Sequence, residues 1–350
     1  MKLGLTSLYL PGSSKIGTGY QVHEYANRLV DRGHDVTVFS PDGPGEAARY
    51  TYRHVDPGSS MRTFRFAWRL RDVDWSAFDV LHGWGDDCFL AGRTRPPHVR
   101  SVMGSCLSEA RRAPGLREKA RMGLLGAGEV ASTLIADRSY GISEATKSVY
   151  PWLDGVIPCG VDLDRFGGAR RPTADPTILF VGTYLWRKRG KLLMDEFAAQ
   201  VRPRFPEARL LMVCSDAPGA AGVEVQGRVD DERLAELYRS AWCFCLPSSY
   251  EGFGVPYIEA LASGCPVVAT PNPGAREVLA EGRYGVLSEP GDLGRALADL
   301  LDDPGRRQQM ADDGRARATT FSWERVLDDY EAVYRDVVAE RPGARWRRLR

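Results

Sequence analysis

Short apolar runs alternate with amphipathic segments along the whole chain. In the first half, residues 2–8 and 35–40 predict strands on either side of a helix over residues 20–32. Further strands are predicted over residues 79–82 and 99–102. Such alternation is typical of a parallel sheet with helices on both faces.

The second half repeats this arrangement with new elements. Strands are predicted over residues 177–181, 209–214 and 242–246. Helices are predicted between them, over residues 190–201 and 231–241. The pattern therefore predicts a second α/β sheet of the same kind.

The two predicted sheets divide the chain into two domains. A stretch rich in Arg, Gly and Pro, residues 164–175, is typical of a linker. We assign residues 1–165 to one Rossmann-like domain and residues 166–322 to a second, followed by a long amphipathic helix and a basic tail over residues 323–350. Ligands of doubly wound sheets bind beyond the carboxyl ends of the strands, so two such sheets facing each other across a cleft would suit transfer between two substrates.

Composition narrows the class of protein. The 350 residues are 43% hydrophobic and 27% charged, with a formal net charge of +1. These values are typical of a globular protein and argue against a disordered chain or a nucleic-acid-binding one. The seven cysteines lack the paired spacing of a zinc site. The first residues lack a secretory signal pattern and no apolar run reaches membrane-spanning length, so we expect a cytoplasmic protein.

The most informative segment covers residues 251–270. It begins with Glu251 and a Gly-Phe-Gly turn, continues as a short helix with Pro256 in its first turn, and ends at Gly264 before a buried strand. Within the helix, Glu259 shares a face with apolar residues. A carboxylate there needs a hydrogen-bonding partner, and the vicinal hydroxyls of a ribose would supply one. Glu251 lies near the free amides at the start of the helix, where an anion such as a diphosphate is favoured.

This segment resembles the E-x7-E motif of the family-4 retaining glycosyltransferases, which have the two-domain GT-B fold. The resemblance implies that Glu259 holds the nucleotide ribose. It also implies that Glu251 and the backbone amides of Gly252, Phe253 and Gly254 contact the donor sugar and its phosphates. The alternative for Glu259 is a structural carboxylate paired with a neighbouring Arg in an ordinary α/β helix.

A basic loop follows the first predicted strand of the second half. Arg187 and Lys188 lie at the carboxyl end of that strand, where they can neutralise a diphosphate. Thr183, at the start of this loop, is a candidate donor-binding residue. Many members of the resembled family carry an Arg at its position, and we expect Arg187 or Arg189 to take the role of that Arg. The alternative is a solvated basic loop without a ligand. The position of the loop, in addition to its charge, favours phosphate binding.

Two further loops resemble donor-binding segments of the family. Gly17 and Gly19 precede the first predicted helix, where glycines let backbone amides approach a phosphate. By themselves, two such glycines are also typical of an ordinary turn. The segment around Val229, residues 226–230, resembles the loop whose main chain contacts the nucleobase. Main-chain contacts do not specify a base, so uridine and guanosine donors both stay open.

The acceptor side gives weaker signals. His82 ends a predicted strand and is a candidate catalytic residue, but a buried structural histidine explains the pattern equally well. Met103 stands where many family members carry a His, which indicates an unusual acceptor. The sequence specifies neither the acceptor nor the oligomeric state.

Two basic stretches raise the question of membrane contact. Residues 62–71 alternate Arg with aromatic and aliphatic residues, and residues 341–350 carry five Arg and one Trp. Helices that lie in the membrane interface show this mixture. Core helices whose Arg side chains reach the surface look similar, and the arginines of the first stretch do not gather on one helical face. Peripheral contact with the inner membrane face is the less favoured of these two interpretations.

Together, the motifs imply a retaining glycosyltransferase that moves a sugar from a nucleoside diphosphate sugar to a hydroxyl acceptor. The acceptor would be a saccharide, a lipid-linked group or a small molecule, in cell-envelope glycan or natural-product biosynthesis. In the resembled family the leaving phosphate oxygen is thought to take the acceptor's proton, so stabilising the diphosphate would be the main catalytic task. Cationic groups would do this without a metal, since the nucleotide half has no Asp-x-Asp cluster, and no cofactor is expected. The alternatives are a sugar-nucleotide epimerase and a non-catalytic nucleotide-sugar sensor.

Overall fold

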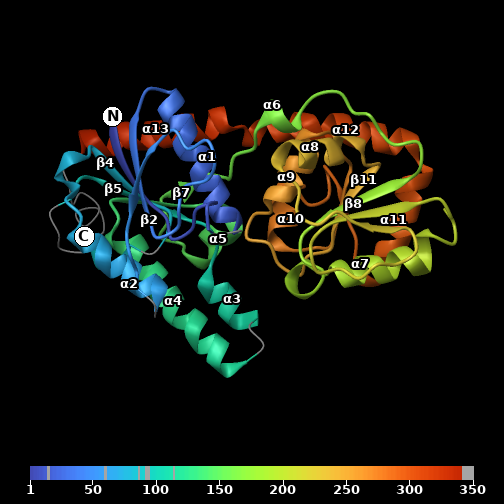
Figure 1. Ribbon diagram of the computed structural model, residues 1–350, viewed down its shortest axis with the longest axis horizontal. Coiled ribbons are helices and arrows are strands. Elements are labelled where there is room, and N and C mark those ends of the chain that lie inside the picture. Colours follow the sequence, from blue (N-terminus) through green and yellow to red (C-terminus); the bar gives the residue numbers. More distant parts are fainter. Residues whose placement is uncertain (14–15, 59–60, 86, 91–94, 113–114, 341–350) are drawn as a thin grey trace. The chain divides into compact units, whose positions relative to one another are not determined.

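The computed structural model describes residues 1–13, 16–58, 61–85, 87–90, 95–112 and 115–340. The described chain forms two compact units, each built on its own sheet (Figure 1). The first unit contains Met1–Cys159 and the segment from Glu324 onward, and the second contains Gly160–Trp323. The divisions thus fall at 159/160 and 323/324, whereas the sequence predicted 165/166 and 322/323. The basic tail over residues 341–350 lies outside the described residues.

The first unit is built on a seven-stranded sheet in the order β3-β2-β1-β4-β5-β6-β7. Every neighbouring pair of strands is parallel. Two of the short strands, the third and the seventh, are not predicted from the apolar pattern because they carry exposed or polar residues. The strands are β1 (Lys2–Thr6), β2 (Asp35–Ser40), β3 (Thr51–His54), β4 (Val80–Gly83), β5 (His98–Val102), β6 (Arg138–Gly141) and β7 (Gly155–Val156).

The helices of the first unit bury one face each. In the first helix the buried residues include Val22, Ala26 and Leu29, which follow the helical repeat. The helices are α1 (Gly17–Asp31), α2 (Arg62–Arg69), α3 (Cys106–Arg112), α4 (Leu116–Ile135) and α5 (Glu144–Val149), with short 3₁₀ turns η1 (Leu70–Asp72), η2 (Trp75–Ala77) and η3 (Cys88–Leu90).

The second unit is built on a six-stranded parallel sheet in the order β10-β9-β8-β11-β12-β13. The residues of its central strands are almost all buried and apolar, which explains why the sequence predicted these strands well. The strands are β8 (Thr177–Val181), β9 (Arg209–Val213), β10 (Val223–Val225), β11 (Cys243–Leu246), β12 (Val267–Ala269) and β13 (Val286–Leu287).

The helices of the second unit connect these strands. The predicted helix over residues 190–201 ends earlier as an α-helix and closes with a π-helical turn over Phe197–Val201. The α-helices are α6 (Leu163–Phe166), α7 (Gly190–Glu196), α8 (Asp231–Ser240), α9 (Val255–Ala262), α10 (Pro273–Val278), α11 (Leu293–Asp302) and α12 (Pro304–Ala318).

The last helix, α13 (Trp323–Ala339), is bonded into the core of the first unit. The hydroxyl of Tyr334 lies 2.5 Å from the hydroxyl of Tyr25 on α1 and 2.5 Å from Nδ1 of His82 on β4. The hydroxyl of Tyr330 lies 2.6 Å from Oγ of Ser101 on β5, which also contacts Nε2 of His82 at 2.8 Å. All five side chains are buried, so these polar groups depend on one another for their hydrogen bonds.

We expect Tyr334→Phe to lower the free energy of unfolding by about 1–3 kcal/mol, because it removes the hydroxyl that contacts both the buried Tyr25 hydroxyl and Nδ1 of His82. Urea unfolding followed by circular dichroism measures this change. Tyr52→Phe is the matched control, since its hydroxyl lies in a partly buried position on β3. Equal losses in the two variants would contradict a special role for the buried network.

Candidate functional site

Two loops of the second unit meet at the point where its strand order reverses. In this sheet β9 lies on one side of β8 and β11 lies on the other. After β8 the chain therefore moves toward one edge of the sheet, and after β11 it moves toward the opposite edge. Such a reversal is where ligands of doubly wound sheets bind. The loop after β8 carries Arg187 and Lys188, and the loop after β11 carries Glu251. The amide of Ser249 donates to the carbonyl oxygen of Arg187 at 2.9 Å and ties the two loops together.

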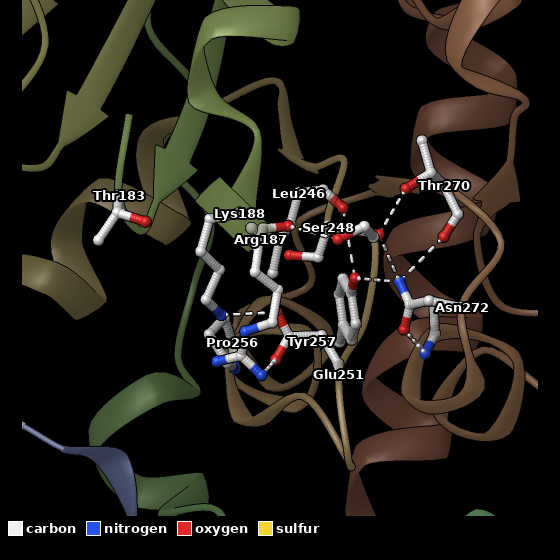
Figure 2. A network of polar contacts seen from close by, with 12 residues as sticks. Thr183, Arg187, Lys188, Leu246, Ser248, Glu251, Pro256, Tyr257, Thr270 and Asn272 are labelled. Atoms are coloured by element: carbon white, nitrogen blue, oxygen red, sulfur yellow. Dashed lines mark hydrogen bonds and ion pairs between the residues drawn. The ribbon is translucent and has the colours of Figure 1, made fainter. Parts of the chain in front are cut away.

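Opposite charges from the two loops face each other (Figure 2). Nζ of Lys188 lies 2.8 Å from Oε1 of Glu251, and a guanidinium nitrogen of Arg187 lies 3.8 Å from Oε2. The Glu251 side chain is only 7% exposed, so its charge depends on these two cations. The sequence-predicted residues Arg187, Lys188 and Glu251 therefore form one ionic cluster.

Arg189 does not join this cluster. It lines a shallow pocket of about 360 Å³ beside the basic loop, together with Trp186, Leu192 and Pro290 among others. Of the two arginines predicted to replace the family's phosphate-binding Arg, the structure therefore places Arg187, and not Arg189, beside Lys188 and Glu251.

The backbone of the Glu251 loop is held from behind by the start of α10. The amide of Gly274 donates to the carbonyl oxygen of Glu251 at 3.0 Å. A Cβ atom on Gly274 would collide with the carbonyl of Phe253, so only glycine allows this close approach. The loop is thereby fixed in the second unit before any ligand arrives.

Asn272 completes this support and was not identified from the sequence. Its Nδ2 lies 3.2 Å from the carbonyl of Ser248, 3.0 Å from that of Thr270 and 3.2 Å from the hydroxyl of Tyr257 (Figure 2). Its Oδ1 accepts from the amide of Ala275 and caps α10. The sequence Asn-Pro-Gly could have indicated the cap, but nothing in it indicates the contacts to the loop.

Helix α9 presents the second glutamate. It begins after Gly254, whose φ of 98° is unfavourable for other residues, and Pro256 lies in its first turn. The hydroxyl of Tyr238, on α8, donates to Oε2 of Glu259 at 3.1 Å. The partner of Glu259 is therefore a tyrosine and not the Arg of the structural alternative.

The surroundings of Glu259 change its ionisation. Removal from water raises the pKa of this carboxyl to about 7, and the hydrogen bond from Tyr238 opposes the rise. Tyr238 is fully buried and belongs to no motif, so sequence reasoning missed it. A half-ionised carboxyl near neutral pH would gain from a ligand that donates hydrogen bonds to its charged form.

The other residues predicted for the donor lie on loops of the second unit that follow β8 and β10. Thr183 is exposed, and its hydroxyl donates to the carbonyl of Leu185 at 3.0 Å. Val229 is partly buried in the loop before α8, next to Asp230, whose side chain caps that helix. Both loops lie on the carboxyl side of the sheet. The predicted role of Thr183 and Val229 in donor binding stays a proposal.

Gly17 and Gly19 lie in the first turn of α1 and not in a loop before it. A Cβ atom on Gly19 would lie about 3.0 Å from the backbone of Tyr9 and 3.1 Å from that of Leu10, so close packing already explains this glycine. Around Gly17 there is open space. Their predicted role in phosphate binding stays a proposal.

The geometry of His82 conflicts with the catalytic role predicted for it. The ring is fully buried, and both of its nitrogens are occupied by Tyr334 and Ser101. Burial lowers the pKa of His82 well below its ordinary value, because the charged ring is disfavoured away from water. We therefore assign His82 to the core that anchors α13.

The basic stretch over residues 62–71 forms α2 and η1. Arg62 is paired with the buried carboxylate of Asp42, and Phe66 lies in the core. Trp68 is 53% exposed, and the guanidinium of Arg71 lies 4.1 Å from its ring centre. Part of this stretch thus belongs to the core, as the alternative interpretation predicted. Among the residues that the structure describes, no group of His, Cys, Asp or Glu side chains is arranged to hold a metal ion.

Comparison with known proteins supports both halves of this architecture. The sequence profile described as Glycosyltransferase Family 4 matches residues 16–165, and that described as glycosyl transferases group 1 matches residues 175–303. The MMP alpha-(1->4)-mannosyltransferase of Mycolicibacterium hassiacum is 40% identical, over 92% of this chain and 95% of the relative.

Two further similarities differ in extent. The phosphatidyl-myo-inositol mannosyltransferase of Mycobacterium tuberculosis is 34% identical over 52% of this chain, and the chain covers about half of that relative, 53%. The sucrose-phosphate synthase of Thermosynechococcus elongatus superposes with a TM-score of 0.80 at 20% identity, over 97% of this chain and 99% of that structure. This similarity confirms the fold class predicted from the sequence, two Rossmann-like units of the GT-B type.

Proposed function

Because the chain belongs to family 4 of the glycosyltransferases, we propose that it transfers a sugar from a nucleoside diphosphate sugar to a hydroxyl acceptor. The anomeric configuration is retained, and no metal takes part. The observation that carries this proposal is the cluster of Arg187, Lys188 and Glu251 at the reversal of the second sheet.

In this proposal each charged group has a separate task. Lys188 and Arg187 neutralise the donor diphosphate, which gains negative charge as the bond to the sugar breaks. The amides at the start of α9, after Gly254, add positive partial charge at the same place. Glu251 then contacts the sugar hydroxyls, which makes it the residue that orients the donor for transfer.

Glu259 binds the ribose. Its carboxylate lies on a helix, is partly buried, and receives one hydrogen bond from Tyr238. Two neighbouring ribose hydroxyls can donate to the remaining acceptor positions of the carboxylate. The base contacts the main chain around Val229, so this arrangement suits uridine and guanosine nucleotides alike.

The acceptor carries a hydroxyl and belongs to a saccharide, a lipid-linked group or a small molecule. Relatives with inositol- and mannose-containing products favour cell-envelope glycans or related compounds.

Incubation of the purified protein with a panel of nucleotide sugars, followed by chromatography, tests the proposed class of reaction. A transferase slowly releases nucleoside diphosphate by transfer to water even without acceptor. An epimerase would instead return an isomerised nucleotide sugar, and a sensor would bind one without changing it. Absence of nucleotide release from every donor, with and without candidate acceptors, would contradict the proposal.

A further inference from the structure

Helix α4 is anchored to the first unit along one face only. Gly126 packs so closely on Leu107 of α3 that a Cβ atom would collide with it. On the same side, Oε2 of Glu129 accepts from the amide of Cys106 at 2.9 Å and from the hydroxyl of Tyr150 at 2.6 Å. These contacts fix the orientation of α4 and therefore determine which residues point away from the unit.

The opposite face of α4 is apolar and uncovered. Leu116 is 85% exposed and Leu124 is 55% exposed. At 100° per residue, the exposed apolar residues of this helix fall within about 80° of arc, directly opposite the packed face. These residues are Leu116, Ala120, Leu124, Ala127 and Leu134, and we call them the α4 stripe. Single exposed leucines are ordinary, but a row along one face of a helix indicates a partner.

Basic side chains border the α4 stripe on both sides. On the helix surface, Arg117 and Arg121 lie along one edge and Lys119 along the other. The nearby acid, Glu118, points away from the stripe and is paired with Arg121 at 2.6 Å. Exposed Arg111 on α3 adds another positive charge at the same end of the two helices, where Glu109 is an exposed acid.

We propose that the α4 stripe docks on a membrane surface rich in anionic lipids. Leucines between flanking Arg and Lys residues match the interface of a bilayer, where acyl chains take the apolar groups and lipid phosphates take the cations. The protein would lie on the surface, because no helix among the described residues has the length and apolar character to cross a bilayer.

Charge complementarity favours an anionic membrane surface over a second copy of the chain as the partner of the α4 stripe. Two copies packed stripe to stripe would bring their Arg and Lys borders close together, and like charges repel. An anionic surface instead strengthens binding by about fivefold for each basic residue that reaches it. The inference rests on the surface of the first unit alone and does not depend on the proposed sugar transfer.

The helix that carries the α4 stripe is linked to the sheet of the first unit through α3. The chain runs from the carboxyl end of β5 at Val102 directly into α3, which packs on α4. The α4 stripe is therefore connected to the segment around Met103 through α3.

Co-sedimentation of the full-length protein with lipid vesicles tests this proposal. We expect binding to phosphatidylcholine vesicles that contain about a third phosphatidylglycerol, weak binding to phosphatidylcholine alone, and loss of binding at high salt. The double variant Leu116→Gln/Leu124→Gln should reduce the bound fraction by about tenfold, because both leucines are exposed and leave the interface. Arg117→Gln/Lys119→Gln should reduce binding by about the same amount and weaken its dependence on salt.

Two control variants make the result specific to the stripe. Val338→Gln changes a residue of α13 that is 47% exposed, and should bind vesicles as the unmodified protein does. Trp68→Gln removes the exposed aromatic residue of α2. The proposal is overturned if the unmodified protein does not bind anionic vesicles, if the leucine variant binds undiminished, or if Trp68→Gln alone abolishes binding. It is also overturned if size-exclusion chromatography shows that the unmodified protein is a dimer and that the leucine substitutions make it a monomer without changing vesicle binding.

Discussion

Lys188→Met is expected to lower the turnover number of sugar transfer by about a hundredfold to a thousandfold. The ammonium group of Lys188 lies at the carboxyl end of β8, where the proposed donor diphosphate gains charge in the transition state. Removal of one preorganised group that stabilises such charge has effects of this size. Initial rates at saturating donor measure the change. Lys191→Met is the matched control, because Lys191 is exposed and paired with Asp195 at 2.7 Å.

A double-variant cycle separates catalysis from structural pairing. Lys188 also neutralises the buried carboxylate of Glu251, so its loss could act only through that side chain. If so, Glu251→Gln would remove the need for Lys188, and the double variant Lys188→Met/Glu251→Gln would regain activity. We expect it to stay inactive, because the diphosphate still lacks its cation. Recovery to within a few fold of the Glu251→Gln variant would refute the role of Lys188 in catalysis.

Glu259→Gln is expected to weaken donor binding by about tenfold to a hundredfold. The amide keeps the shape of the side chain, but it replaces two charge-assisted hydrogen bonds to the ribose with weaker ones. Isothermal titration calorimetry with UDP-glucose and GDP-mannose measures the affinity. Glu236→Gln, an exposed substitution on α8, serves as the control. An unchanged affinity for every donor that binds the unmodified protein would contradict the assignment of Glu259 to the ribose.

The same residue gives donor binding a defined pH dependence. Because the pKa of Glu259 is raised to about 7 and a ribose would favour its charged form, donor affinity should rise with pH and level off above about pH 7. At pH 6, about a tenth of the carboxyl is ionised, so affinity should be about tenfold below the plateau. Stability of the free protein should change in the opposite sense, since a carboxyl with a raised pKa favours folding at low pH and loses that contribution as pH rises through 7. Glu259→Gln should flatten both profiles.

The parts of this site that could be predicted from sequence have local causes. Gly254, Pro256 and Gly264 determine where α9 begins and ends, and each acts through its own backbone preferences. The cations after β8 were found because a buried apolar strand fixes where its loop begins. Their meeting with Glu251 follows from the pairing of β8 with β11, which the sequence pattern did not specify.

The parts that could not be predicted depend on which distant residues meet. A strand pattern places His82 on β4 but does not say that its ring faces Tyr334, more than 200 positions away in the sequence. Tyr238 and Asn272 act through contacts between separate elements and leave no local pattern. Helix α12 was missed for a different reason, because it buries only small residues such as Ala311 and Gly314 and shows no apolar stripe.

The attachment of α13 to β4 and β5 has a consequence for how the protein is made on the ribosome. The first unit needs Tyr330 and Tyr334 to complete its core, yet these residues are translated only after the whole of the second unit. At ordinary elongation rates the nascent first unit waits about ten to thirty seconds for them. During that time Nδ1 of His82 lacks the hydroxyl of Tyr334. The early part of the chain should therefore be the part that depends most on chaperones during synthesis.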